Sequence, residues 1–141
     1  MAKEPLKLIY ADLVNAVATV AERKNIYIGG RPNVINEESV VSSYVVIDLP
    51  ASVEDIAFGN RRFVLDTAGV IYLFVKGKKD RTLNINATSS LVEKVTGLFP
   101  IVGDVCGAAN PKVLMRGSDE YGYQVVSITF DLQTKPNAFS D

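Results

Sequence analysis

Residues 123 to 134 read Tyr-Gln-Val-Val-Ser-Ile-Thr-Phe-Asp-Leu-Gln-Thr, and this stretch decides the fold class of the chain. Its later part alternates apolar and polar side chains without a break: Val126, Ser127, Ile128, Thr129, Phe130, Asp131, Leu132 and Gln133. Successive side chains of a β-strand point to opposite faces of the sheet. The alternation therefore predicts a strand that turns its apolar face to the core, while its other face is wet or meets a polar partner.

Four more strands are predicted upstream, at Val40 to Leu49, Arg62 to Asp66, Val70 to Lys76 and Lys112 to Arg116. In the first of them Val45, Ile47 and Leu49 share one face. Residues 67–69 (Thr-Ala-Gly) are expected to form a turn between the second and third strands, and residues 101–111 a connector that contains glycine, alanine and proline. The third strand is apolar on both faces, which predicts a place in the middle of the sheet.

Two helices complete the pattern. Apolar residues at helical spacing predict the first from Leu6 to Ala21 and the second from Thr88 to Phe99, with Ser90 and Glu93 as a capping box. The element order is then α, β, β, β, α, β, β within a single domain over residues 1–141. Tight turns between strands favour an α+β fold in which both helices pack on one face of a mostly antiparallel sheet of about five strands.

A long segment between the first helix and the first long strand, Asn25 to Ser39, is expected to form an extended arm or irregular hairpin that protrudes from the domain. Its interface residues are predicted to be Tyr27, Ile28, Arg31, Val34 and Ile35. A small domain would gain stability by docking the apolar members of this set on an adjacent copy.

One concentrated basic patch follows the central strand. It consists of Lys76, Lys78, Lys79 and Arg81, in a chain whose net charge is −1. Two interpretations stay open: a solvated loop, or a contact with DNA phosphate or with an acidic neighbouring subunit. The net charge gives no global field that would make DNA binding the main role.

The composition argues against the common catalytic sites. The chain has no histidine, which removes Ser-His and Cys-His nucleophile pairs and histidine-based zinc sites. The single cysteine, Cys106, is interpreted as a small apolar filler. The carboxylates show no spacing that predicts a metal site, so no catalytic, cofactor-binding or metal-binding residue is expected. No apolar run approaches the length of a membrane span.

The six tyrosines come from different elements, and they are interpreted as core edges or subunit contacts rather than as a grouped stacking platform for nucleic acid. They are Tyr10, Tyr27, Tyr44, Tyr72, Tyr121 and Tyr123.

In this order of elements the chain resembles the tail-completion family of tailed bacteriophages, which is similar in fold to their tail-terminator and head-to-tail joining proteins. The resemblance rests on patterns and not on a ligand motif. It covers the opening helix, Tyr44 to Ile47, Val70 to Val75, Leu91 to Val95, and Val113 to Tyr123 leading into Val126 to Phe130. The chain departs from the family in the arm and in an insertion-like stretch from Ala51 to Asn60.

The resemblance implies a structural virion protein that forms a homo-oligomeric ring at the head-tail junction, around the DNA passage. Its partners would be other copies of itself, portal, connector or tail proteins, and packaged DNA through non-specific contact, with no membrane and no cofactor. It would assemble in the bacterial host cytoplasm. Because fold alone does not fix function, a non-enzymatic cytoplasmic binding or scaffolding module is the alternative.

Overall fold

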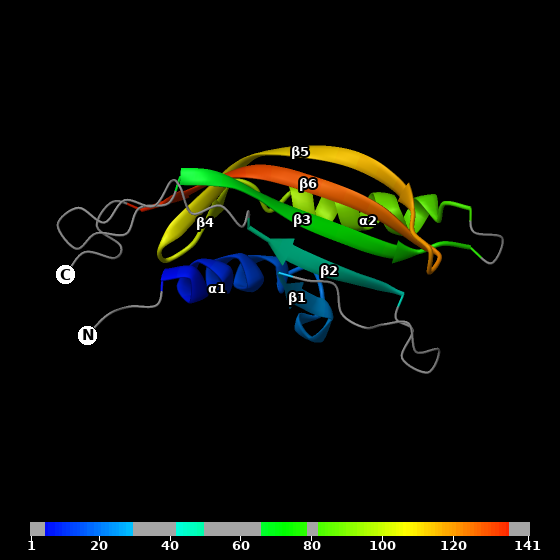
Figure 1. Ribbon diagram of the computed structural model, residues 1–141, viewed down its shortest axis with the longest axis horizontal. Coiled ribbons are helices and arrows are strands. Elements are labelled where there is room, and N and C mark those ends of the chain that lie inside the picture. The colour runs from blue at the N-terminus through cyan, green and yellow to red at the C-terminus, as the bar shows by residue number, and fades with distance from the viewer. Residues whose placement is uncertain (1–4, 30–41, 50–65, 79–81, 136–141) are drawn as a thin grey trace.

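The computed structural model describes residues 5–29, 42–49, 66–78 and 82–135. These residues form an α+β fold in which a curved sheet wraps around two helices (Figure 1), and the predicted fold class is confirmed. In chain order the elements are α1 Pro5–Val17, the short 3-10 helix η1 Arg23–Asn25, β1 Ile26–Ile28, β2 Ser43–Asp48, β3 Asp66–Lys76, α2 Ile85–Thr96, β4 Ile101–Val102, β5 Cys106–Ser118 and β6 Tyr123–Thr134.

The sheet has the strand order β1-β2-β3-β6-β5-β4. Its neighbouring strands are antiparallel, except that β1 runs parallel to β2. The long strands β3 and β6 lie in the middle and pair along their whole shared length, from Asp66 beside Gln133 to Lys76 beside Tyr123. The central position predicted for the apolar run in β3 is therefore confirmed, and β6 has the predicted bounds.

The main core lies between the sheet and the two helices, which both pack on one face as expected. Its buried members alternate along the strands and recur at helical spacing along α1. They include Ile9, Leu13, Val17, Val45, Ile47, Ile71, Leu73, Val95, Val126, Ile128, Phe130 and Leu132. The alternation read from residues 126–133 thus places the apolar half of β6 against the helices.

The turn predicted over residues 67–69 is wrong, because β3 runs through it as one strand from Asp66. Gly69 lies opposite Phe130 in the ladder, and a Cβ atom at Gly69 would come 2.6 Å from Phe130 Cζ. The glycine therefore leaves room for an aromatic ring on the neighbouring strand instead of reversing the chain. The rest of the separate strand predicted from Arg62 lies outside the described residues.

The connector predicted over residues 101–111 is also wrong, because these residues form β4 and the first half of β5. The register of β5 against β6 shifts between Ala109 and Lys112, where Asn110 has a φ of 60° and Pro111 follows it. A bulge at a sheet edge accommodates both features. Asparagine and proline thus mark a bulge within a strand here and not a loop.

Helix α2 begins three residues earlier than predicted. Its N-cap is Asn84, whose Oδ1 accepts a hydrogen bond from the backbone N–H of Ala87 at 3.3 Å. Ser90 and Glu93 lie inside the helix, so the predicted capping box does not form the start. The predicted apolar stripe still faces the core through Leu91, Val92 and Val95.

Candidate interaction surface

The second half of β5 forms an open edge of the sheet. The short strand β4 pairs with β5 at Gly107 and Ala108, and among the described residues no strand pairs with the outer side of β5 beyond them. Residues 112–118 are all exposed. An unpaired strand edge presents free N–H and C=O groups that can pair with another extended segment.

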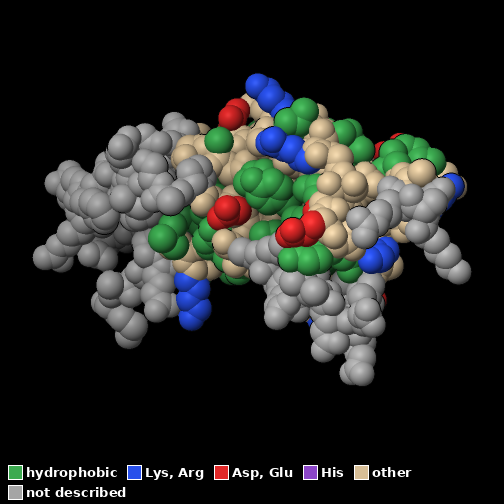
Figure 2. All heavy atoms as spheres, turned by 45° about the vertical axis from the view of Figure 1, so that its right-hand side comes forward, with side chains coloured by type: hydrophobic (Ala, Val, Ile, Leu, Met, Phe, Trp, Pro, Cys, Tyr) green, Lys and Arg blue, Asp and Glu red, His purple; other side chains and the backbone are tan. Residues whose placement is uncertain are grey.

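Three consecutive apolar side chains stand exposed on this open edge. Val113, Leu114 and Met115 have exposed fractions of 44%, 53% and 51%. Val113 and Met115 lie on the face of the sheet that carries the helices, since they pair with the core residues Ile128 and Val126, whereas Leu114 lies on the opposite face. The edge therefore offers apolar contacts on both faces to an added strand. In Figure 2 hydrophobic side chains likewise reach the surface between charged ones.

Two cations border these apolar residues. Lys112 and Arg116 are exposed, and neither is ion-paired with a described residue. The Nε atom of Arg116 donates a hydrogen bond to Ser127 Oγ at 3.1 Å, which holds the guanidinium on the same face as Leu114. Edge lysines discourage indiscriminate strand pairing, and they also favour an acidic partner.

The predicted arm residues fall into two groups. Tyr27 and Ile28 lie in β1, where Ile28 is 51% exposed and Tyr27 packs its ring edge on Tyr44 at 6.1 Å between centroids. Arg31, Val34 and Ile35 lie outside the described residues. Because β1 and β2 are parallel, the chain between them must cross back over about a dozen residues. The parallel pairing therefore accounts for the length of this segment, and the length alone no longer argues for a protruding arm.

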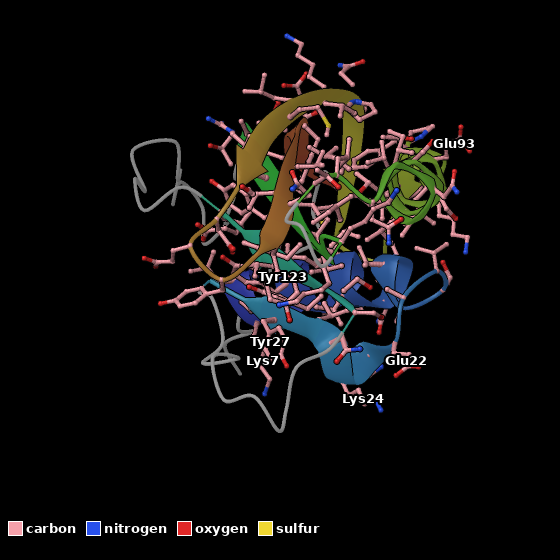
Figure 3. All side chains as sticks on the ribbon, turned by 90° about the vertical axis from the view of Figure 1, so that its right-hand side faces the viewer. Lys7, Glu22, Lys24, Tyr27, Glu93 and Tyr123 are labelled. Atoms are coloured by element: carbon pink, nitrogen blue, oxygen red, sulfur yellow. The ribbon has the colours of Figure 1, made fainter. Side chains whose placement is uncertain are left out.

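Five of the six tyrosines belong to an apolar cluster, which agrees with their interpretation as core edges although they lie closer together than their separate elements suggest. Tyr27, Tyr44, Tyr72, Tyr121 and Tyr123 gather with Phe74 in a second apolar cluster on the face of the sheet away from the helices. In the end-on view of Figure 3, the labelled residues Tyr27 and Tyr123 are drawn close together. The ring of Tyr44 stacks on that of Phe74 at 4.4 Å, and Tyr44 and Tyr123 are each 1% exposed. The rings of Tyr44 and Tyr123 therefore belong to a small core and do not form a stacking platform for nucleic acid.

Of the predicted basic patch, only Lys76 and Lys78 lie among the described residues. The Nζ atom of Lys76 donates to the backbone oxygen of Tyr121 at 3.1 Å and lies 5.0 Å from the centre of the Tyr123 ring. This lysine therefore supports the turn between β5 and β6. Lys78 is exposed, and Lys79 and Arg81 lie outside the described residues.

A buried carboxylate that the sequence interpretation missed is Asp12 on α1, which is 8% exposed. Its two oxygens accept hydrogen bonds from the backbone N–H groups of Asp104, Val105 and Cys106 at 3.0, 2.8 and 3.2 Å. Three successive N–H groups form a concave anion site, and here the carboxylate of Asp12 fills it. The interaction fastens the β4–β5 hairpin, and with it the start of the open edge, to the first helix.

The thiol of Cys106 contacts the same carboxylate. Cys106 is fully buried, and its Sγ donates to Asp12 Oδ2 at 3.5 Å. Burial, the charge of Asp12 and this hydrogen bond together raise the pKa of Cys106 to about 12, and burial is the largest of these causes. A thiol that stays protonated at neutral pH is a poor nucleophile, in agreement with its interpretation as a filler.

This pKa predicts a pH dependence of stability. Between about pH 8.5, where an unfolded thiol ionises, and pH 12, the unfolded state loses the proton that the folded state keeps, so rising pH favours unfolding. From pH 7.5 to pH 10 the wild type should lose about 2 kcal/mol more of its free energy of unfolding than Cys106→Ala, measured with urea. Equal losses in the two proteins would contradict a buried, protonated thiol.

The described parts of the chain contain no group of three histidine, cysteine, aspartate or glutamate side chains placed to hold a metal ion. A hollow of about 350 Å³ opens between the end of α1, the start of β2 and α2, and Glu22 and Lys94 contribute to its lining. Figure 3 shows Glu22 just before η1, Lys24 on η1 and Glu93 on α2, all pointing outward.

Within the described residues, no helix combines the length and the apolar character needed to span a membrane. The chain matches no protein-family model and no curated protein.

Proposed function

We propose that the chain is a structural virion protein of a tailed bacteriophage, which forms a homo-oligomeric ring at the head-tail junction around the DNA passage. The observation that carries the self-assembly is the open outer edge of β5 with Val113, Leu114 and Met115 exposed on it. A monomeric protein usually shortens or covers such an edge or fills it with charges, whereas this edge exposes three consecutive apolar residues between its two cations. The position in the virion rests on the sequence resemblance alone.

A ring is the assembly that suits this surface best. The open edge belongs to β5, beside the short terminal strand β4, and β1 lies at the opposite end of the strand order, so the two sides of one subunit differ. A contact between two different surfaces of identical copies runs head to tail, and it closes into a ring where the rotation fits. No catalytic residue takes part in this function, and the protein is not proposed to be an enzyme.

The alternative, a cytoplasmic binding or scaffolding module, is supported by the same edge, because a foreign extended peptide could add to it as another strand. Electron microscopy of the protein purified at high concentration, and of the intact particle, separates the two. We expect closed rings with a central hole, one ring for each tail. A single copy per particle, or chains bound only to an unrelated protein, would refute the ring.

The basic patch gives a second test of the proposal. Replacing Lys78, Lys79 and Arg81 together with Ser should weaken retention of packaged DNA or assembly of the ring, because these cations would face the passage or an acidic subunit. Both quantities are measured on purified particles against wild type. If neither changes, the patch is a solvated loop. Lys76 is kept because it holds the turn at Tyr121, and Lys94→Ser, which removes an exposed lysine of α2 outside the patch, serves as the control.

A further inference from the structure

We infer that the open edge of β5 binds the arm of a neighbouring copy, with residues 34–37 lying antiparallel to residues 112–115 as an added strand. This inference rests on the proposed function, since it names the contact that would join two subunits of the ring. It identifies one occupant, the segment Val34-Ile35-Asn36-Glu37 of a second copy of this chain.

The apolar residues on both segments favour this register. In an antiparallel pair, directly opposed side chains lie on the same face of the sheet and touch. The register places Ile35 opposite Leu114 and Val34 opposite Met115, two apolar pairs on the two faces. At each of them about half of the β5 side chain is exposed in the single subunit.

The charges favour the same alignment. With Ile35 opposite Leu114, Glu37 comes opposite Lys112, so an exposed lysine without an ion partner among the described residues meets a carboxylate. Lys112 and Leu114 lie on one face of β5, and Glu37 and Ile35, two residues apart, also share a face of an extended strand. Opposite charges that face each other across a strand pair stabilise it and exclude slipped registers.

The irregularities of β5 exclude the parallel direction. A parallel strand with Ile35 beside Leu114 would bring Glu37 to Arg116, where the register between Met115 and Gly117 is already shifted by a bulge. The antiparallel strand uses Lys112 to Met115, the four residues that pair regularly with β6 between the two bulges. Regular pairing on the inner side leaves a regular outer side for an added strand.

The same charges argue against a contact between two β5 edges. Pairing two copies about Leu114 would place Lys112 of each copy opposite Arg116 of the other. Like charges directly opposed destabilise a strand pair. The acidic and apolar arm is therefore a better occupant of this edge than a second β5.

The test exchanges the charges between the two surfaces. Lys112→Glu alone and Glu37→Lys alone should each raise the concentration for half-assembly by roughly tenfold, since each opposes like charges. A mixture of the two proteins should recover assembly, because each edge then meets an arm of opposite charge from the other chain. Sedimentation velocity measures the fraction of protein in the oligomer. Lys94→Glu on the exposed face of α2 is the control for Lys112→Glu, because it makes the same change of charge away from the edge.

The possible results distinguish a failure of this contact from a failure of the proposed ring. If the wild type forms no ring, the proposed function fails and this inference with it. If the wild type and both single variants assemble equally well, the ring stands but the arm does not bind this edge. If Glu37→Lys is rescued by Arg116→Glu and not by Lys112→Glu, the antiparallel register is wrong. Rescue in the mixture also excludes misfolding as the cause of the single losses.

Discussion

Asp12→Ala should lower the free energy of unfolding by roughly 3 to 5 kcal/mol, one of the two largest losses expected in this chain. The substitution removes both carboxylate oxygens from three backbone N–H groups, of which that of Cys106 is buried. A buried donor left without an acceptor costs more than the hydrogen bond itself contributed. Urea unfolding followed by circular dichroism measures the loss.

Two companion variants make this test specific. Asn15→Ala, one turn further along the exposed side of α1, should change stability by less than about 1 kcal/mol. Gly103→Ala should reproduce much of the loss, because a Cβ atom there would collide with the side chain of Asp12. Within the Asp12→Ala protein, Gly103→Ala should cost much less. Independent, additive losses would mean that the carboxylate does not fasten the hairpin.

Asp12 also shows what the sequence could have revealed. It lies three residues after Ile9 and next to Leu13, on the apolar side of a helix whose spacing was recognised. A carboxylate on the buried side of an amphipathic helix requires donors, and that is a usable signal. Its partners could not be predicted, because they are backbone groups more than ninety residues away in a segment taken for a connector.

The strands whose faces differ in polarity were predicted well. Period-two alternation of apolar and polar residues sets the faces of β6 directly, so Phe130 and Leu132 lie in the main core as expected, and Val45 and Ile47 of β2 also lie on their predicted shared face. The errors concern glycine, asparagine and proline, which are typical of turns but serve other purposes here. Gly69 makes room for a ring, and Asn110 belongs to a bulge.

Neither the tyrosine cluster nor the open edge could be read from the sequence. The five clustered tyrosines come from β1, β2, β3 and the β5–β6 hairpin, and only the strand order brings these elements together. Likewise, a strand containing Val113, Leu114 and Met115 is equally compatible with a central position. Its exposure follows from β4 being only two residues long, so that β4 covers just the beginning of β5.

The second large effect is expected at Phe130, where Phe130→Ala should cost about 3 to 5 kcal/mol of the free energy of unfolding. The side chain is 2% exposed, and its ring lies 5.4 Å from that of Phe99. Its removal leaves a cavity between the sheet and α2. Thr129→Ala, the neighbour on the opposite face, should cost less than about 1 kcal/mol. Comparable urea midpoints for these two variants would refute the assignment of faces.

A substitution at Gly69 tests the packing of the Phe130 ring in a second way. Gly69→Ala should destabilise the wild type, because the new Cβ atom would press on the Phe130 ring from 2.6 Å. In the Phe130→Ala protein that ring is gone, so the same methyl group keeps only the contact with Leu49 Cδ2 at 3.1 Å and fills part of the space that the ring occupied. Gly69→Ala should therefore cost less there than in the wild type, as a double-mutant cycle by urea unfolding would show. Equal costs in the two backgrounds would mean that the absence of a side chain at Gly69 does not serve the packing of Phe130.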